Sequence, residues 1–132
     1  MTHEIHSGLD EIDWGEKEGQ ALNLGYDEYF NEIVEEWKSG NTRLPVIGGE
    51  SPQDVADRQK PALEKILNDP EDLVLVCMHG RAIRILLCVM LNIPLSRMDE
   101  FPHHNLGLYI IQFSEGEFII EEHNLTGHLE GI

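Results

Sequence analysis

Basic residues are scarce in this sequence, and long apolar runs are absent. Nine Lys and Arg stand against 25 Asp and Glu among 132 residues, which gives a formal net charge of −16 at pH 7. Nucleic acid and anionic lipid are bound by clustered Lys and Arg, so the composition argues against both as partners. The longest apolar stretch, Ala82 to Leu91, contains Arg84 and is shorter than the ~20 residues of a membrane helix. The first residues lack the basic and apolar regions of a signal peptide.

Cysteine is nearly absent as well, with only Cys77 and Cys88 in the chain. Both lie in apolar stretches, which predicts buried free thiols rather than a disulfide. Free thiols are typical of a reducing compartment, so we expect a cytoplasmic protein. The chain is 41% hydrophobic and 26% charged, and it has no repeat or low-complexity linker. We therefore expect a single domain over residues 1–132.

The first half of the chain predicts two helices. Apolar residues recur at helical spacing from Tyr29 to Trp37, and Gly40 ends the pattern. Further on, Ser51 is followed by proline, the usual pairing of an N-cap with the first helical position, and the helical pattern then runs to about residue 67. Pro61 lies inside this second helix, which predicts a kink or an early break there.

The second half of the chain predicts strands as well as a helix. Leu73–Met78 is a continuous apolar run, which indicates a strand buried on both faces and hence a parallel sheet with helices on each side. Arg81–Leu91 is apolar almost all round and predicts a buried helix. Leu106–Phe113 and Glu117–His123 flank a glycine-containing turn at Ser114–Gly116, which is typical of a hairpin. The sum predicts an α/β fold.

The junction between the predicted strand and the buried helix is the first candidate site. His79 and Gly80 lie there, at the edge of the sheet where open α/β folds bind ligands. The start of a helix offers free N–H groups and partial positive charge, which suit a phosphate. An imidazole at this position could stabilise a phosphoryl group. The spacing alone leaves open the alternative that His79 only caps the turn.

Two loop segments are further candidates. Glu11 lies among small, aromatic and acidic residues on a predicted loop, and a carboxyl group pressed against apolar neighbours could serve as a general acid. It could equally be one of many solvated surface charges. The glycines of Gly48–Ser51 precede a helix cap and could cradle an anion, or they could simply let the chain turn.

Histidines of the carboxyl-terminal part show no metal-binding pattern. Adjacent side chains in a strand or loop point apart, and no pair has helical i,i+4 spacing. We therefore expect neither a metal nor another cofactor, although the four side chains concerned could ligate one in principle: His103, His104, His123 and His128.

Four motifs follow one another along the chain and together span it from about Leu9 to Leu129. They are LDEIDWGEKEG at residues 9–19, GGES at residues 48–51, VLVCMHGRAIRILLC at residues 74–88, and NLTGHL at residues 124–129. In this order they resemble the landmarks of the histidine phosphatase (phosphoglycerate mutase-like) superfamily.

The resemblance implies both a fold and a site. It implies a three-layer sandwich with a mostly parallel sheet, flanking helices and a carboxyl-terminal β-hairpin. By resemblance, His79 matches the family's second active-site histidine and Glu11 its proton donor, while Gly80 and Arg81 lie with His79 at the phosphate site. Phosphomonoester hydrolysis of a small phosphorylated substrate follows, with phosphatase favoured over mutase because the segment around Glu11 looks like that of the phosphatases.

One landmark of the resembled family is missing from the sequence. The family carries its nucleophilic histidine in an Arg-His-Gly motif on a first strand, and no such triplet occurs here. His79 could not both attack phosphorus and stabilise the same group. We therefore expect a truncated domain that is inactive alone and that covers its exposed strand edge with a second copy or a separate amino-terminal fragment. The alternative is a non-catalytic remnant that serves as a binding or oligomerisation module.

Overall fold

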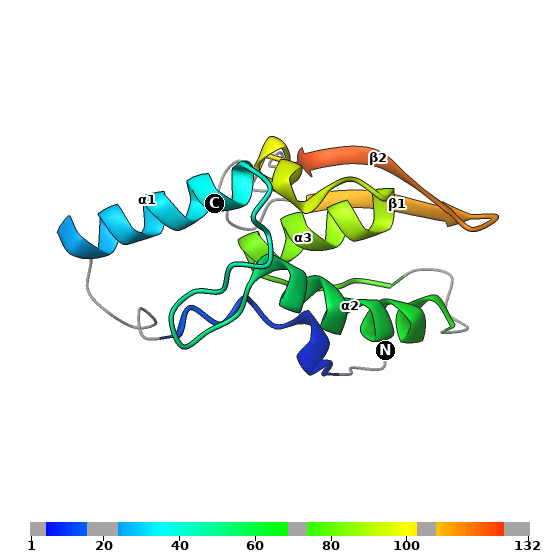
Figure 1. Cartoon of the computed structure of the whole chain (residues 1–132). Coiled ribbons are helices and arrows are strands. Elements are labelled where there is room, and N and C mark those ends of the chain that lie inside the picture. The colour runs from blue at the N-terminus through cyan, green and yellow to red at the C-terminus, as the bar shows by residue number, and fades with distance from the viewer. Residues whose placement is uncertain (1–4, 16–23, 69–73, 103–107, 126–132) are drawn as a thin grey trace, which may run out of the picture.

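The computed structural model describes residues 5–15, 24–68, 74–102 and 108–125 (Figure 1). Helix α3 lies at the centre, with α2 on one side of it and a two-stranded hairpin on the other. The elements in chain order are η1 (Ser7–Leu9), α1 (Leu24–Lys38), α2 (Pro52–Leu67), α3 (Gly80–Leu91), η3 (Leu95–Glu100), β1 (Leu108–Ser114) and β2 (Glu117–Leu125).

Helix α1 confirms the first predicted helix. Ile33 and Trp37, one turn apart, are buried in the core, and the Trp37 indole N–H donates to the carbonyl of Leu44 at 2.8 Å. Gly40 follows the helix with a φ of +113°, a left-handed value that glycine adopts at little cost.

Helix α2 begins as the sequence predicts. The Ser51 hydroxyl accepts a hydrogen bond from the Asp54 N–H at 3.1 Å, and the Ser51 N–H donates to the Asp54 carboxylate at 2.9 Å. This reciprocal capping box satisfies two N–H groups of the first turn. Of the kink or early break expected at Pro61, the early break is wrong, because the helix runs on to Leu67. Pro61 lies on the exposed side, while the buried face continues past it through Ala62.

Helix α3 is buried as predicted, and it ends where the sequence indicates. Ile85 and Leu87, on different sides of the helix, are both almost fully buried. Asn92 closes the helix in the left-handed region with a φ of 55°, which asparagine tolerates better than most residues. Pro94, two residues further on, is the N-cap residue of η3.

The predicted hairpin is confirmed within the described residues. Strands β1 and β2 pair antiparallel, with Ser114 opposite Glu117. The two turn residues, Glu115 and Gly116, have φ values of 54° and 80°, as a type I′ turn requires. The described part of the chain contains this two-stranded sheet alone, and Leu106 of the predicted first strand lies outside it.

One hydrophobic core joins α1, α2, α3 and η3. Trp37 lies within it, and the ring of Trp14 packs against Trp37 with centroids 6.1 Å apart. The buried members of the core are Ile12, Ile33, Trp37, Val46, Val55, Ala56, Ile85, Cys88 and Met98.

The prediction of a strand at Leu73–Met78, buried on both faces, is wrong for its described part. Residues 74–79 form no strand in the structure, and Leu75 is 76% exposed, with Val74 and Val76 near 40%. An apolar run is buried only where other elements cover it, and no described strand pairs with this one.

The two cysteines differ for the same reason. Both are free, as predicted, but only Cys88 of helix α3 is buried. Cys77 lies in the uncovered segment and is exposed, so the prediction of burial is wrong for it. Burial raises the pKa of the Cys88 thiol to about 11. None of the described helices has the length and apolar character needed to cross a membrane.

Candidate functional site

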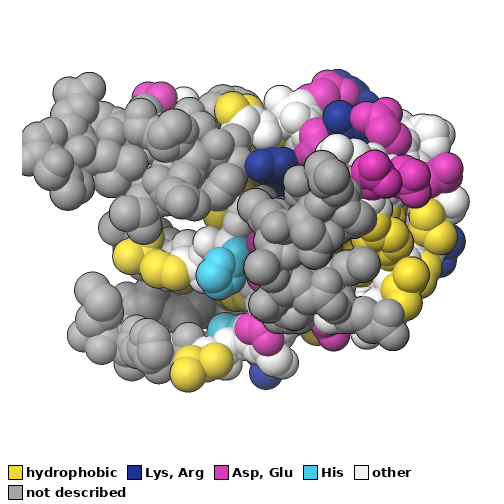
Figure 2. Space-filling model, turned by 90° about the vertical axis from the view of Figure 1, so that its left-hand side faces the viewer, with side chains coloured by type: hydrophobic (Ala, Val, Ile, Leu, Met, Phe, Trp, Pro, Cys, Tyr) yellow, Lys and Arg dark blue, Asp and Glu magenta, His cyan; other side chains and the backbone are white. Residues whose placement is uncertain are grey.

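His79 stands at the start of helix α3 with an exposed side chain. It is the N-cap residue, in extended conformation, and its imidazole makes no capping hydrogen bond. The alternative that the side chain merely caps the turn is therefore not what the structure contains. Figure 2 shows histidine side chains reaching the surface beside acidic and hydrophobic ones.

Glu11 is brought to the same helix start from 70 residues away. Its carboxylate accepts hydrogen bonds from the backbone N–H groups of Ala82 at 2.8 Å and Arg81 at 3.2 Å. It also accepts one from the N–H of Ile12 at 3.0 Å. The sequence singled out the apolar residues near this carboxyl group, whereas its hydrogen-bond partners are all backbone N–H groups. Its neighbours are the N–H donors at the positive end of helix α3, which stabilise a negative charge.

This contact changes what helix α3 offers to an anion. Of the N–H groups in its first turn, those of Arg81 and Ala82 already donate to Glu11. An incoming oxyanion must therefore share the helix start with a carboxylate or displace it. The sequence predicted a helix start whose N–H groups are free to bind phosphate. In the structure two of these N–H groups are occupied by the Glu11 carboxylate of the same chain.

The guanidinium of Arg81 belongs to a separate charge cluster. It pairs with the Asp99 carboxylate and lies over the Trp37 ring, 5.8 Å from its centroid. Arg84 donates to the same Asp99 oxygen at 2.8 Å. The Arg81 side chain is only 9% exposed, and burial lowers its pKa despite the partner carboxylate. The side chain of Arg81 is therefore engaged by Asp99, and its backbone N–H is the group that lies beside Glu11. The phosphate contact predicted for Arg81 falls to this N–H.

The Gly48–Ser51 loop packs against the segment that carries Glu11. The Glu50 N–H donates to the Asp13 carbonyl at 2.9 Å, and the Asp13 N–H donates to the Glu50 carboxylate at 3.0 Å. A Cβ on Gly49 would lie 2.1 Å from the Asp13 carbonyl oxygen, so only glycine fits there. Close approach of two loops accounts for this glycine, and it gives no support to an anion cradle.

Arg58 of helix α2 escaped the sequence reasoning. Its guanidinium binds both oxygens of the Glu50 carboxylate, at 2.8 and 2.9 Å, and the carbonyls of Gly8 and Glu11 at 2.7 and 3.0 Å. The pair lowers the pKa of Glu50 and raises that of Arg58. The available signal in the sequence was the position of Arg58 three residues after Val55, which places a basic residue near the apolar face of the helix.

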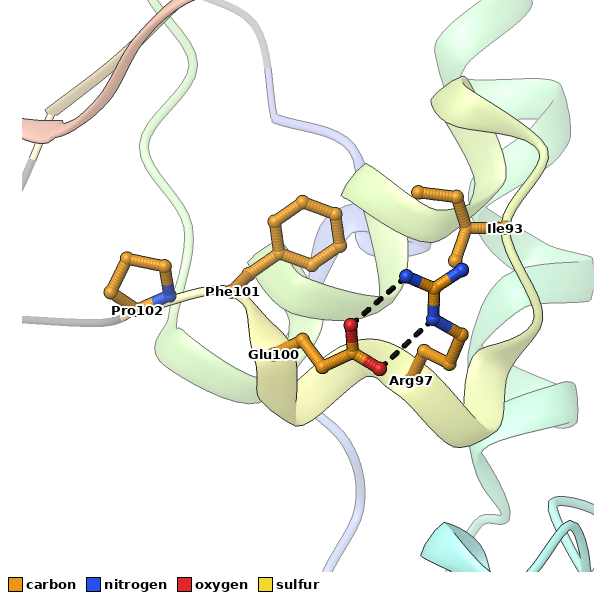
Figure 3. Close-up of a pocket in the computed structure, with 5 residues that line it drawn as sticks. All are labelled: Ile93, Arg97, Glu100, Phe101 and Pro102. Atoms are coloured by element: carbon orange, nitrogen blue, oxygen red, sulfur yellow. Dashed lines mark hydrogen bonds and ion pairs between the residues drawn. The ribbon is translucent and has the colours of Figure 1, made fainter.

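The four histidines weighed as metal ligands lie outside the described side chains: His103, His104, His123 and His128. The residues that the structure does describe hold no group of three metal-binding side chains. A pocket of about 200 Å³ is lined by Arg97, Glu100, Ile93, Phe101 and Pro102 (Figure 3). In it Arg97 and Glu100 pair through two hydrogen bonds of 2.9 and 3.0 Å, so each neutralises the other. Neither candidate catalytic residue lines this pocket.

Several solved structures share the fold. The mycobacterial glucosyl-3-phosphoglycerate phosphatase in complex with VO3 superposes with a TM-score of 0.76 at 20% identity, covering 96% of this chain and 65% of that protein. The same enzyme with inorganic phosphate gives 0.71 at 19% identity, covering 91% and 63%. A mutant phosphoserine phosphatase of Entamoeba histolytica, in complex with phosphoserine, gives 0.74 at 23% identity, covering 96% and 65%. The chain thus spans less than two thirds of their length.

Sequence comparison adds the family. No curated protein sequence matches this chain significantly. The family profile of the histidine phosphatase superfamily (branch 1) matches residues 1–126, nearly the entire chain. The α/β fold of the chain and the order of its motifs agree with that match. The chain belongs to the histidine phosphatase superfamily.

Proposed function

We propose that this chain carries part of a phosphatase site that acts on a small phosphorylated substrate. The observation that carries the proposal is that Glu11, far from helix α3 in sequence, hydrogen-bonds to the first turn of this helix, at whose N-cap the exposed His79 stands. A helix start with an exposed imidazole suits a phosphoryl group. Structurally similar proteins are phosphatases, and two of their structures hold inorganic phosphate or phosphoserine.

The proposed reaction is phosphoryl transfer to a histidine followed by hydrolysis. A nucleophilic imidazole forms a bond to phosphorus as the bond from phosphorus to the ester oxygen breaks. Glu11 is proposed to leave the N–H groups of Arg81 and Ala82 as phosphoryl oxygens take them, and to give a proton to the leaving oxygen. His79 and the N–H of Gly80 contact the phosphoryl oxygens and stabilise their charge. Arg81 contributes its backbone N–H to this site.

This chain by itself is proposed to be inactive. The described residues provide one histidine at the site, and an imidazole that stabilises the phosphoryl group cannot also attack it. Turnover of a generic aryl phosphate should therefore stay at background. Clear turnover that is lost in His79→Ala, or a phosphorylated histidine on the isolated chain, would contradict this reasoning.

Binding of inorganic phosphate tests the site without requiring turnover. Calorimetric titration should detect phosphate binding to the parent chain, and His79→Ala should weaken it by roughly tenfold, the loss of one charge-assisted hydrogen bond. Lys60→Ala, on the exposed side of helix α2, is the matched control and should bind like the parent. Equal affinity in the parent and in His79→Ala would remove His79 from the site.

We also propose that a further polypeptide covers residues 74–78. Pairing there would create the parallel sheet and the three-layer arrangement that the resemblance implies, with residues 1–132 as one domain beside the added polypeptide. Val74, Leu75 and Val76 expose apolar surface. Burying a fully exposed side chain of this kind stabilises by roughly 1.5–3 kcal/mol, and Leu75, which is 76% exposed, would gain the most. The proposed partner is a second copy of the chain or a separate amino-terminal fragment. The proposed location is the reducing cytoplasm, because it suits two free thiols.

The same surface favours the second candidate function, a non-catalytic binding or oligomerisation module. Light scattering and the phosphate titration together distinguish the phosphatase site from the non-catalytic module. Self-association that Leu75→Glu abolishes, in a chain that does not bind phosphate, supports the module. Phosphate binding that depends on His79 supports the phosphatase site, whatever the oligomeric state. A well-folded, strictly monomeric chain would contradict pairing with a second copy.

A further inference from the structure

We infer that Arg58 is a positioning residue that holds Glu11 at the start of helix α3, an inference that rests on the proposed role of Glu11. Arg58 lies on helix α2 and donates to the carbonyl of Glu11 itself at 3.0 Å. A second hydrogen bond, of 2.7 Å, reaches the carbonyl of Gly8 three residues earlier. One guanidinium thus fixes the backbone that enters the Glu11 position.

Glu50 extends the hold to the other side of Glu11. It binds Arg58 through both carboxylate oxygens, and it accepts a hydrogen bond from the Asp13 N–H at 3.0 Å. The Glu50 N–H returns a bond to the Asp13 carbonyl at 2.9 Å. The ion pair of Arg58 and Glu50 therefore fixes the chain before and after Glu11, and we call this pair the clamp.

Close packing leaves the clamped segment little freedom. A Cβ on Gly8 would lie 2.5 Å from the carbonyl oxygen of Arg58, so this segment lies directly on the backbone of helix α2. Next to Glu11, the side chain of Ile12 is 1% exposed and sits in the hydrophobic core. With the backbone fixed at these points, the Glu11 side chain has a defined reach toward the N–H groups of Arg81 and Ala82.

The hydrogen bonds of Arg58 argue for positioning rather than for direct binding of phosphate. A guanidinium has five N–H donors, and four hydrogen bonds from Arg58 go to acceptors of this chain. The carboxylate of Glu50 also neutralises its charge in a bidentate pair. Arg58 therefore acts through Glu11, whose backbone carbonyl accepts one of its four hydrogen bonds.

The amide resonances of Arg81 and Ala82 report the position of Glu11 without any need for activity. Both N–H groups donate to the Glu11 carboxylate and neither touches Arg58. Helix α2 reaches the same turn through Gln59, whose side-chain amide donates to the Ala82 carbonyl at 2.9 Å. The Ile83 N–H shares a peptide group with that carbonyl, so its resonance stays at the parental position when the change comes through Glu11 alone and moves when helix α2 itself is disturbed. In Glu11→Ala the two resonances shift, and hydrogen exchange at Ala82 accelerates by roughly tenfold, as a charge-assisted hydrogen bond is lost. This variant defines the reference change.

Arg58→Ala is expected to move both resonances toward their Glu11→Ala positions, with the amides at the far end of helix α3 unchanged. Arg58→Lys keeps the charge without the planar fork and should restore part of the parental shift. Lys60→Ala, on the same helix and exposed, should leave both resonances at their parental positions. Parental shifts at Arg81 and Ala82 in a folded Arg58→Ala chain would overturn the inference.

Glu50→Gln covers the case in which Arg58→Ala does not fold. The neutral amide keeps the shape of the side chain and weakens the bidentate pair, so the same two resonances should move in the same direction by a smaller amount. Unmoved resonances in Glu50→Gln would equally overturn the inference. If the parent chain does not bind inorganic phosphate but the resonances respond as expected, the proposed phosphatase site is contradicted and the role of the clamp is supported.

Discussion

Replacing Asp99 by alanine removes the shared counter-ion of two arginines. One oxygen of this carboxylate accepts hydrogen bonds from both Arg81 and Arg84. In the folded chain the side chain of Arg81 is 9% exposed to solvent and that of Arg84 is 22% exposed. The variant would leave two neighbouring guanidinium groups with like charge, little water and no carboxylate between them.

The expected cost follows from the burial of this cluster. Breaking a buried ion pair by removal of one partner costs about 3–5 kcal/mol, because the other charge stays buried. Asp99 and Arg84 keep about a fifth of their exposure, so water screens part of the repulsion that remains. We expect the free energy of unfolding to fall by about 2–4 kcal/mol. That is a large share of the about 5–15 kcal/mol typical of a domain.

Urea unfolding followed by tryptophan fluorescence measures this change, since Trp37 lies in the core beside Arg81. Asp57→Ala is the matched control, because Asp57 pairs with Lys60 at 4.0 Å on the surface. Such an exposed pair contributes about 0–1 kcal/mol, so the control should unfold almost like the parent. Equal unfolding free energies for Asp99→Ala and Asp57→Ala would refute the reasoning about the buried cluster.

Three smaller predictions concern other parts of the chain. Ser51→Ala should lower the free energy of unfolding in urea by about 1 kcal/mol, because it removes the side-chain half of the capping box of α2. Arg58 lowers the pKa of Glu50 in the folded chain, so their pair stabilises the fold above the ordinary carboxyl value of 4.5 and loses this effect as the pH falls through the folded pKa. Stability measured in urea from pH 6 down to pH 3 should therefore fall less steeply in Glu50→Gln. A thiol reagent should modify Cys77 in the folded chain when no partner covers residues 74–78, and Cys88 only after unfolding, because the Cys88 thiol is buried with a pKa of about 11.

Features that depend on neighbouring residues were predictable from the sequence. The start of helix α2 is set by Ser51 and the proline after it, and the end of helix α3 by Asn92. The hairpin turn needs positive φ at two positions, and Glu115 and Gly116 supply it. In each case the determining contacts lie within four residues, so the pattern and the structure agree.

Features that depend on distant residues were not predictable in the same way. The apolar run at residues 74–78 has the composition of a buried strand, but composition cannot say whether a neighbour covers it. The contact of Glu11 with helix α3 joins residues 70 positions apart, and resemblance, not spacing, singled out this glutamate. Arg58 went unnoticed because a helical pattern places a charge near a face without naming its acceptor, here the carbonyl of Gly8, 50 positions away.

The position of Glu11 predicts how its own replacement affects anion binding. The carboxylate holds two N–H groups that a phosphoryl oxygen would use, and its charge repels a phosphate that binds beside it. Two unit charges 4 Å apart in water interact by about 1 kcal/mol, and by more where the site is partly buried. In Glu11→Gln the side chain keeps its shape and loses the charge, so inorganic phosphate should bind at least about fivefold more tightly. Weaker phosphate binding in Glu11→Gln than in the parent would mean that the anion site does not lie at the start of helix α3, because no like charge would then have been removed from it.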